Sequence, residues 1–166
     1  MFKIDADNIG WLETLKNPRE DLCLHGHATV IIGEKRFEYN ATISASALYL
    51  LKTLTEDHII YEDNQMLPCC GFFLIADEKL ENVCISGCPN GIDWSVIHDG
   101  ENVRLILEDG SATVVSLSEY KKEVYKFADK VEAFYKSSEP RELPKDEFDR
   151  NGYIAFWNEW YRRRNE

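Results

Sequence analysis

The clearest pattern in the chain is an alternation of apolar and polar residues from 22 to 43. Before a turn predicted at Gly33–Lys35, the residues that share one face of the alternation are Leu22, Leu24, Gly26, Ala28, Val30 and Ile32. After the turn they are Phe37, Tyr39, Ala41 and Ile43. Successive side chains on a strand point to opposite faces, so this period predicts a β-hairpin with one buried face.

The pattern then changes to helical spacing, with apolar residues at Ala47, Leu48, Leu51 and Leu54. Ser44 or Ser46 is expected to cap the start of this helix. The segments "GFFLIA" and "NVCISG" have the length and composition of strands. In "DWSVIHDGENVRLILEDGSATVVSL" the dipeptides Asp99-Gly100 and Asp109-Gly110 separate three β-rich runs, which predicts a three-stranded meander.

Two helices are predicted at the C-terminal end. The first is expected to start at an N-cap Ser118 and to end near Ser137, and its apolar face holds Tyr120, Val124, Phe127, Ala128, Val131, Phe134 and Tyr135. "SSEPRELP" interrupts it, and a last helix starts between Pro144 and Asn151. The predicted fold class is therefore α+β: an antiparallel β-sheet, made of a hairpin plus a meander, with one helix after the first hairpin and two C-terminal helices packed on the sheet.

Length and composition favour a single α+β domain over residues 1–166, because 44% of the residues are hydrophobic and suffice for a core. No apolar stretch approaches the roughly 20 residues that span a bilayer, and the first residues do not read as a signal peptide. We expect a soluble, cytoplasmic protein without a membrane partner. Five cysteines, an odd number, are expected to be reduced thiols.

The charge changes this picture, because the net charge of −11 is concentrated in the middle of the chain. Between Thr55 and Gly110 there are twelve acidic residues and only two basic ones. Most of these acids fall in predicted turns. Such a surface repels nucleic acid and anionic membranes and attracts basic proteins. An alternative is that acidic turns simply keep the protein in solution.

Candidate chemistry is sparse. Cys70, Cys84, Cys88 and His98 are soft ligands that suit zinc, but their spacing does not match a zinc motif, and buried structural thiols are the expected role. Cys70 would be a nucleophile only with a histidine beside it. His25 and His27 lie on one strand face, where a third histidine such as His98 would complete a metal site. We expect no cofactor and no enzymatic activity; a metal- or thiol-dependent hydrolase using these residues is the alternative.

The segment "YIAFWNEWYRRR" near the end of the chain combines aromatic residues with three arginines. Its aromatic residues fall on one helical face: Tyr153, Phe156, Trp157, Trp160 and Tyr161. Stacking of nucleic-acid bases needs a positive field, which this protein lacks, so nucleic acid is not an expected partner. We expect Phe156, Trp157 and Trp160 in the core, and the arginines at the negative helix end facing acidic residues. An exposed stripe would instead indicate a structural adaptor that docks through this helix.

Residues 93–115 ("DWSVIHDGENVRLILEDGSATVV") and 116–164 ("SLSEYKKEVYKFADKVEAFYKSSEPRELPKDEFDRNGYIAFWNEWYRRR") resemble small acidic bacterial proteins of the toxin-immunity type. The resemblance covers the C-terminal half. It implies a non-catalytic inhibitor whose acidic surface binds a basic toxin or effector. We expect the chain to be a monomer or a homodimer. We expect Tyr61 and Trp94 as aromatic anchors. The partner-binding residues are predicted to be Glu62, Asp63, Asp93, Trp94, Asp99, Glu101, Glu108 and Asp109.

Overall fold

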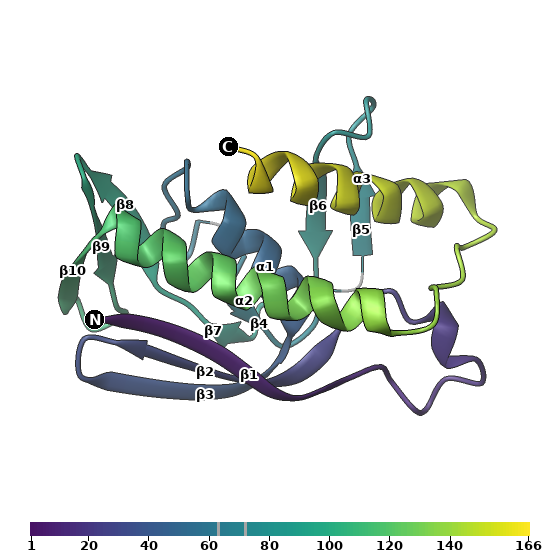
Figure 1. Cartoon of the computed structure of the whole chain (residues 1–166), viewed down its shortest axis with the longest axis horizontal. Coiled ribbons are helices and arrows are strands. Elements are labelled where there is room, and N and C mark those ends of the chain that lie inside the picture. Colours follow the sequence, from purple (N-terminus) through teal and green to yellow (C-terminus); the bar gives the residue numbers. More distant parts are fainter. Residues whose placement is uncertain (63, 72) are drawn as a thin grey trace.

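A computed structural model describes the whole chain except residues 63 and 72 (Figure 1). The first half contains β1 (Phe2–Gly10), a 3-10 turn (Pro18–Glu20), β2 (His25–Ile32), β3 (Lys35–Thr42) and α1 (Ile43–Lys52). Short strands follow: β4 (Leu67–Pro68), β5 (Phe73–Ala76), β6 (Val83–Ser86) and β7 (Gly91–Ile92). The chain ends with β8 (Ser95–Asp99), β9 (Asn102–Ile106), β10 (Ala112–Ser116), α2 (Leu117–Ser137) and α3 (Glu147–Arg164).

The predicted hairpin and meander are both confirmed. β2 and β3 pair antiparallel around the turn at Gly33, and β8, β9 and β10 form the three-stranded meander. The segments predicted as strands at 71–76 and 82–87 pair with each other as β5 and β6. Among the described residues, the strands form separate antiparallel sheets, in the orders β1-β2-β3, β10-β9-β8, β4-β7 and β5-β6. The hairpin and the meander therefore do not belong to one continuous sheet.

β1 is an element that the sequence reading missed. It pairs antiparallel with β2, so that Phe2 lies opposite Ile32 and Ala6 opposite Ala28. Phe2, Ile4 and Ala6 are all buried, whereas the residues between them are exposed. This alternation is the same signal that revealed the hairpin, but it is only three apolar residues long.

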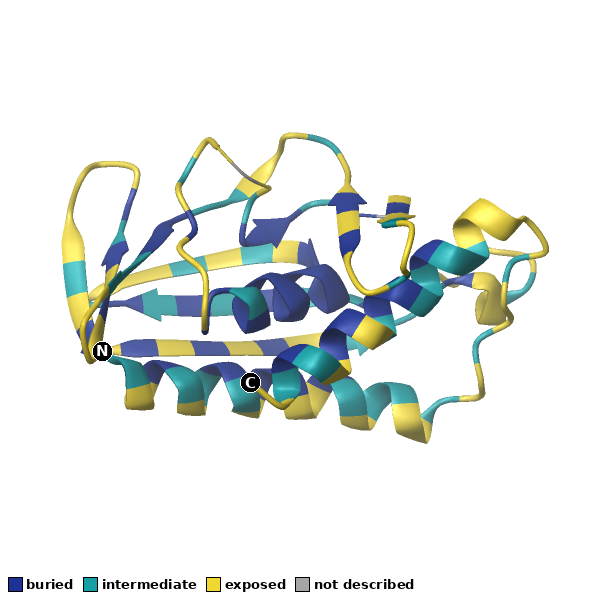
Figure 2. Cartoon of the chain, turned by 90° about the horizontal axis from the view of Figure 1, so that it is seen from above, coloured by how far each residue is buried: buried dark blue, intermediate teal, exposed yellow. Residues whose placement is uncertain are grey.

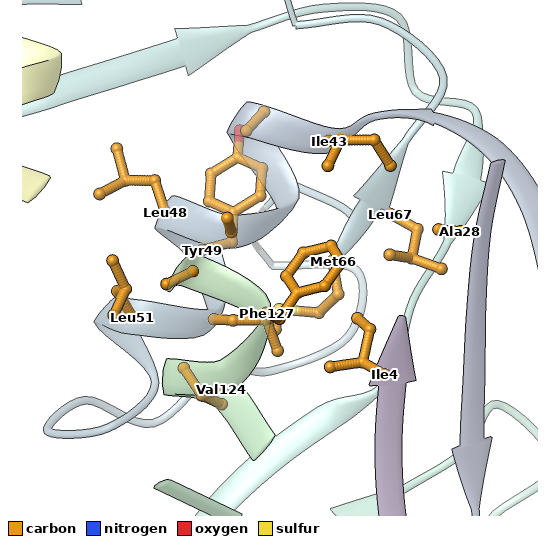
Figure 3. Close-up of a cluster of buried hydrophobic side chains, with 14 of the residues drawn as sticks. Ile4, Ala28, Ile43, Leu48, Tyr49, Leu51, Met66, Leu67, Val124 and Phe127 are labelled. Carbon is orange, nitrogen blue, oxygen red and sulfur yellow. The ribbon is translucent and has the colours of Figure 1, made fainter. Parts of the chain in front are cut away.

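α1 lies at the centre of the molecule. Its residues Ile43 to Leu51 are all buried, as the dark helix in Figure 2 shows. On one side it contacts β2 and β3, and on the other it contacts α2 and α3. α2 also runs along β1, and α3 packs mainly on the β5–β6 hairpin (Figure 1). The core in Figure 3 joins these layers, with side chains from β1 (Ile4), β2 (Ala28), α1 (Leu48, Leu51) and α2 (Val124, Phe127).

The structure corrects the predicted caps of the first two long helices. Ser44 and Ser46 lie inside α1 and are buried: the Ser44 hydroxyl accepts the Leu24 amide at 3.0 Å, and the Ser46 hydroxyl donates to the Thr42 carbonyl. At α2 the cap is Ser116, whose hydroxyl accepts the Glu119 amide, and Ser118 is already helical. α1 starts one residue before Ser44 and three before Ser46, and α2 starts one residue before Ser118.

The break at "SSEPRELP" is confirmed, and Asp146 caps the start of α3. Phe156 and Trp160 are buried, as expected, whereas Trp157 is half-buried and Tyr161 is 47% exposed. Gly152 permits the close packing of α3 on β5, because a Cβ atom at this position would collide with the Leu74 carbonyl oxygen. In the described residues, no helix combines the length and the apolar composition that crossing a membrane requires.

Candidate functional site

The acidic turns of the meander lie at its two opposite ends. Asp99 and Glu101 precede β9, and Glu108 and Asp109 follow it. β9 has five residues, so these two turns are separated by about 17 Å of extended strand. The acidic surface that the sequence suggested is therefore divided into two faces.

The face at the Glu108 end contains a groove of about 440 Å³, which we call the acidic groove. Its lining residues are Lys35, Phe37, Gly91, Ile92, Asp93, Leu107, Glu108 and Asp109. Of the described residues that line it, Lys35 alone is basic. Lys35 comes from the start of β3 and donates hydrogen bonds to the Asp109 carboxylate and, at 3.2 Å, to the Ser111 hydroxyl. The hydrogen bond from Lys35 holds the pKa of Asp109 well below its usual value.

Tyr61 stands at the rim of this groove. Its side chain is 74% exposed, and its hydroxyl donates a hydrogen bond to Glu108. That bond to a carboxylate raises the pKa of Tyr61. Glu62, the next residue, is also exposed, and Asp63 lies outside the described residues. The Tyr61 ring is thus accessible to a partner and lies beside the Glu108 carboxylate.

Asp93 lines the acidic groove, but its carboxylate is bound to other residues of the protein. Its carboxylate contacts the His58 ring nitrogen Nε2 at 2.8 Å and accepts the Met66 amide at 3.1 Å. The His58 and Asp93 side chains are both more than nine-tenths buried. The backbone of His58 also pairs with Val96 of β8. Asp93 therefore fastens the segment before β4 to the meander, and little of its charge faces outward.

The proposed anchor role of Trp94 is wrong for this surface. Its side chain has no exposed area, and its ring lies 6.4 Å from the ring of Phe2 within the core. Asp93 and Trp94 are neighbours in the chain, but the Asp93 carboxylate contacts His58 whereas the Trp94 ring is in the core. The sequence did not show which of these two residues faces the core. In the structure it is Trp94, the larger and more apolar side chain.

The opposite face of the meander carries Asp99 and Glu101, which are both exposed. Next to them, Asp57 accepts hydrogen bonds from the His98 backbone amide at 2.8 Å and contacts its ring nitrogen Nδ1 at 2.7 Å. The hydrogen bond from the His98 amide, and then the contact with the His98 ring, lower the pKa of Asp57. His98 is thus held by a carboxylate on this face and does not approach the cysteines.

The cysteines gather in a different combination from the one predicted. The sulfur atoms of Cys69, Cys70 and Cys88 all lie within 4.8 Å of one another. A disulfide joins Cys69 to Cys88, which corrects the expectation that these two are reduced thiols. Cys70 remains free, with its sulfur 3.0 Å from that of Cys88. Cys84 is exposed on β6, opposite Ile75, and outside this group.

His25 and His27 do share one strand face, and both line a shallow groove that also includes Asn40 and Cys69. The His25 ring lies 3.2 Å from the Asp21 carboxylate, and the His27 ring contacts the Asn40 amide oxygen at 3.0 Å. Burial alone would raise the pKa of Asp21, but hydrogen bonds from His25 and from the amides of Leu12 and Cys23 bring it below its usual value. His98 does not join this pair.

A larger hollow of about 480 Å³ lies between the end of α1 and the β5–β6 hairpin, and the sequence did not predict it. Its acidic and basic lining residues are Lys52, Glu56, Asp57 and Asp77, and His58 and Cys84 also form part of its wall. Charges of both signs occur together here. The Lys52 ammonium is held by the Val83 carbonyl at 3.2 Å and by the Glu159 carboxylate at 3.4 Å.

The arginines of α3 face acidic residues, as expected. Arg163 is buried and forms ion pairs with Glu56 and Glu159, and Arg164 pairs with Asp129. The sequence reading overlooked Glu159, a charged residue within the aromatic stripe. Its carboxylate is 1% exposed and accepts the Val83 amide of β6 at 2.8 Å. A charge at a core position of an amphipathic helix is the signal that would have identified it.

Comparison with known proteins finds no matching family model, no matching curated protein and no matching solved structure.

Proposed function

We propose that this chain is a non-enzymatic protein-binding module of the immunity type, and that the acidic groove and its rim bind a basic toxin or effector. The observation that carries the proposal is Tyr61, a 74% exposed aromatic ring that is hydrogen-bonded to Glu108 at the edge of the groove. Exposed tyrosines are frequent anchors of protein interfaces, because they bury a large area at a small cost in conformational entropy.

The charge around Tyr61 favours a cationic partner. Glu108 accepts a hydrogen bond from the Tyr61 hydroxyl, and Glu62 is the next residue in the chain and is exposed. Asp109 is balanced by Lys35. The chain as a whole carries a net charge of −11. A field of one sign speeds association with a partner of the opposite sign, and this steering weakens as salt rises. The proposed complex forms in the cytoplasm, with the chain as a monomer or a homodimer.

The proposal assigns binding to the Tyr61 face and leaves the Asp99–Glu101 turn as an internal control. A photo-crosslinking phenylalanine derivative in place of Tyr61 identifies the partner in the native host. The affinity for that partner is then measured by calorimetry at 50 and 300 mM salt. The double variant Glu62→Lys, Glu108→Lys is expected to weaken binding at least about tenfold. The matched double variant Asp99→Lys, Glu101→Lys changes the charge equally and is expected to bind within about threefold of the parent chain.

The inhibitory role is tested separately by growth. Expression of the captured partner alone is expected to stop growth, and co-expression of the parent chain, but not of the Glu62→Lys, Glu108→Lys variant, is expected to restore it. A harmless partner would contradict the immunity role while leaving the binding role intact. An affinity that neither salt nor this variant changes would contradict the acidic-groove interface.

The two alternatives have less support. A hydrolase using Cys70, Cys84, Cys88 and His98 would need these residues together, yet Cys84 and His98 lie apart from the other two. An adaptor docking through α3 would need an exposed aromatic stripe, yet Phe156 and Trp160 are in the core.

A further inference from the structure

We propose that Cys69, Cys70 and Cys88, when reduced, form a three-thiolate binding site for a soft cation of the Zn²⁺ class. We call these three residues the thiol cluster. This site is separate from the acidic groove and does not depend on the proposed function. Thiolate sulfur is the ligand that Zn²⁺ and other thiophilic cations prefer in proteins.

The separations of the sulfur atoms fit a shared ion. All three lie within 4.8 Å of one another, and those of Cys70 and Cys88 are 3.0 Å apart. Zinc–sulfur bonds of about 2.3 Å in a tetrahedral site place the sulfurs about 3.8 Å apart. The sulfurs of the Cys69–Cys88 and Cys70–Cys88 pairs are closer than this, so the disulfide must be reduced and the side chains must move apart before an ion fits between them.

The backbone explains why two adjacent cysteines point to one place. Adjacent residues on a strand face opposite ways, but the chain bends at Cys69, directly after β4. The Cys69 amide donates to the Asn90 carbonyl at 3.0 Å, which ties this bend to the loop that carries Cys88. Gly87 allows the two loops to approach, because a Cβ atom there would collide with the Cys70 carbonyl oxygen.

A second contact fixes the position of the Cys70 sulfur. It accepts a hydrogen bond from the Cys88 backbone amide at 3.0 Å. A hydrogen bond of this kind orients a ligand atom before the metal binds. Cys23 lies outside the cluster: it is buried, and burial raises its pKa to about 12. The thiol cluster is only half-buried.

Oxidation and metal binding exclude each other at this site, because the Cys69–Cys88 disulfide uses two of the three ligands. A dithiol reductant transfers two electrons and two protons to this bond, giving two thiols, and is itself converted to a disulfide. Binding of Zn²⁺ then displaces the thiol protons. Three protein ligands leave a fourth position, which water or an added ligand fills from the exposed side.

Reduced protein is titrated with Co²⁺ and then with Zn²⁺ under anaerobic conditions. We expect one equivalent of Co²⁺ to bind, with sulfur-to-cobalt charge-transfer absorption and the d–d bands of tetrahedral coordination, and Zn²⁺ to displace it. Cys70→Ser is expected to weaken Zn²⁺ binding at least about tenfold, measured against a chromophoric chelator. Cys84→Ser is the matched control, since Cys84 is an exposed thiol outside the cluster, and it is expected to bind like the parent chain.

Circular dichroism of each variant shows whether it is folded, and Cys69→Ser and Cys88→Ser provide a second test of the cluster if Cys70→Ser is not. The oxidised parent chain is expected to bind no more than a tenth of an equivalent. Absence of stoichiometric binding to the reduced protein would overturn the proposal. So would equal losses of affinity in Cys84→Ser and Cys70→Ser, or binding that persists after all three cluster cysteines are replaced by serine.

Discussion

The carboxylate of Glu159 is almost fully buried and is surrounded by groups of opposite charge. It contacts Arg163 at 3.3 Å and Lys52 at 3.4 Å, and it accepts the Val83 amide. These contacts join α3, α1 and β6 through one side chain. A buried charge is tolerated when ion pairs and hydrogen bonds replace its contacts with water. If one member of such a group is removed, the remaining charges lose that compensation.

Replacement of Glu159 with alanine is expected to lower the free energy of unfolding by about 3 kcal/mol, because Arg163 and the Val83 amide lose their buried partner. Chemical denaturation of the parent and variant measures the difference. Glu78, exposed in the turn between β5 and β6, is the control, and Glu78→Ala is expected to change stability by no more than about 0.5 kcal/mol. Equal effects of the two substitutions would refute a special role for Glu159.

The free thiols Cys23 and Cys84 differ in accessibility, and this difference provides a second test at the residue scale. Cys23 is buried and its pKa is raised to about 12, whereas Cys84 is exposed. Iodoacetamide reacts with thiolates, so at pH 8 we expect rapid alkylation of Cys84 and none of Cys23 in the folded protein. Peptide mass spectrometry after timed alkylation measures both. Alkylation of Cys23 at a rate similar to that of Cys84, without unfolding, would contradict its buried position.

At the scale of elements, the start of α2 depends on the pair Ser116 and Glu119. The Ser116 hydroxyl accepts the Glu119 amide and donates to the Glu119 carboxylate at 2.8 Å. Glu119 is the third residue after Ser116, which is the spacing of a capping box. The neighbouring Ser118 was the cap expected from the sequence, so this pair offers a matched comparison.

Ser116→Ala is expected to lower the free energy of unfolding by about 1 kcal/mol, because the Glu119 amide loses its acceptor. Ser118→Ala is expected to cost less than half of that, since its hydroxyl contacts only the Ser116 hydroxyl among the described residues. Thermal unfolding followed by circular dichroism at 222 nm ranks the two. A larger effect at Ser118 would place the cap where the sequence analysis first put it.

Elements were predictable where a local period is long enough to read. The alternation at 22–43 and the Asp-Gly dipeptides of the meander gave the correct strands, and the helical period gave α1, α2 and α3. β1 carries the same alternation in Phe2, Ile4 and Ala6, but three apolar residues are too few to predict a strand. Its pairing with β2 is what shows that it is one. A local pattern therefore predicts whether a segment is a helix or a strand, but it does not predict which other segments that element packs against.

The candidate sites were less predictable, because they depend on which segments meet. The sequence identified acidic turns, yet the length of β9 separates Asp99 from Glu108. It grouped Cys70, Cys84, Cys88 and His98 as candidate zinc ligands, whereas the structure brings Cys69 and Cys70 to Cys88 and leaves the other two outside. It offered Trp94 as an anchor, and packing against Phe2 buries it. The separation of the turns follows from the meander itself, whereas the positions of the cysteines and of Trp94 follow from tertiary contacts that no local pattern encodes.

For the whole molecule, acid is expected to reduce stability. The pKa values of Asp21, Asp57 and Asp109 are all lowered by hydrogen bonds in the folded protein. The pKa of an aspartate in an unfolded chain is about 3.9. The stability from these carboxylates is therefore fully present above that pH, and it is lost as pH falls through the lower folded values. Urea unfolding at pH 7 and pH 3 is expected to show a lower midpoint at pH 3, and equal midpoints would refute the shifts.

The position of β1 beneath α2 has a consequence for how the chain is made. Phe2, Ile4 and Ala6 are buried, and α2 runs along the strand that holds them. β1 is synthesised long before α2, which ends only at Ser137. While the chain emerges from the ribosome, β1 can pair with β2, but its apolar face has no cover until most of the sequence has been translated. The native packing of β1 can therefore form only after α2 has been synthesised. Until then the nascent chain exposes an apolar sheet face, to which chaperones can bind.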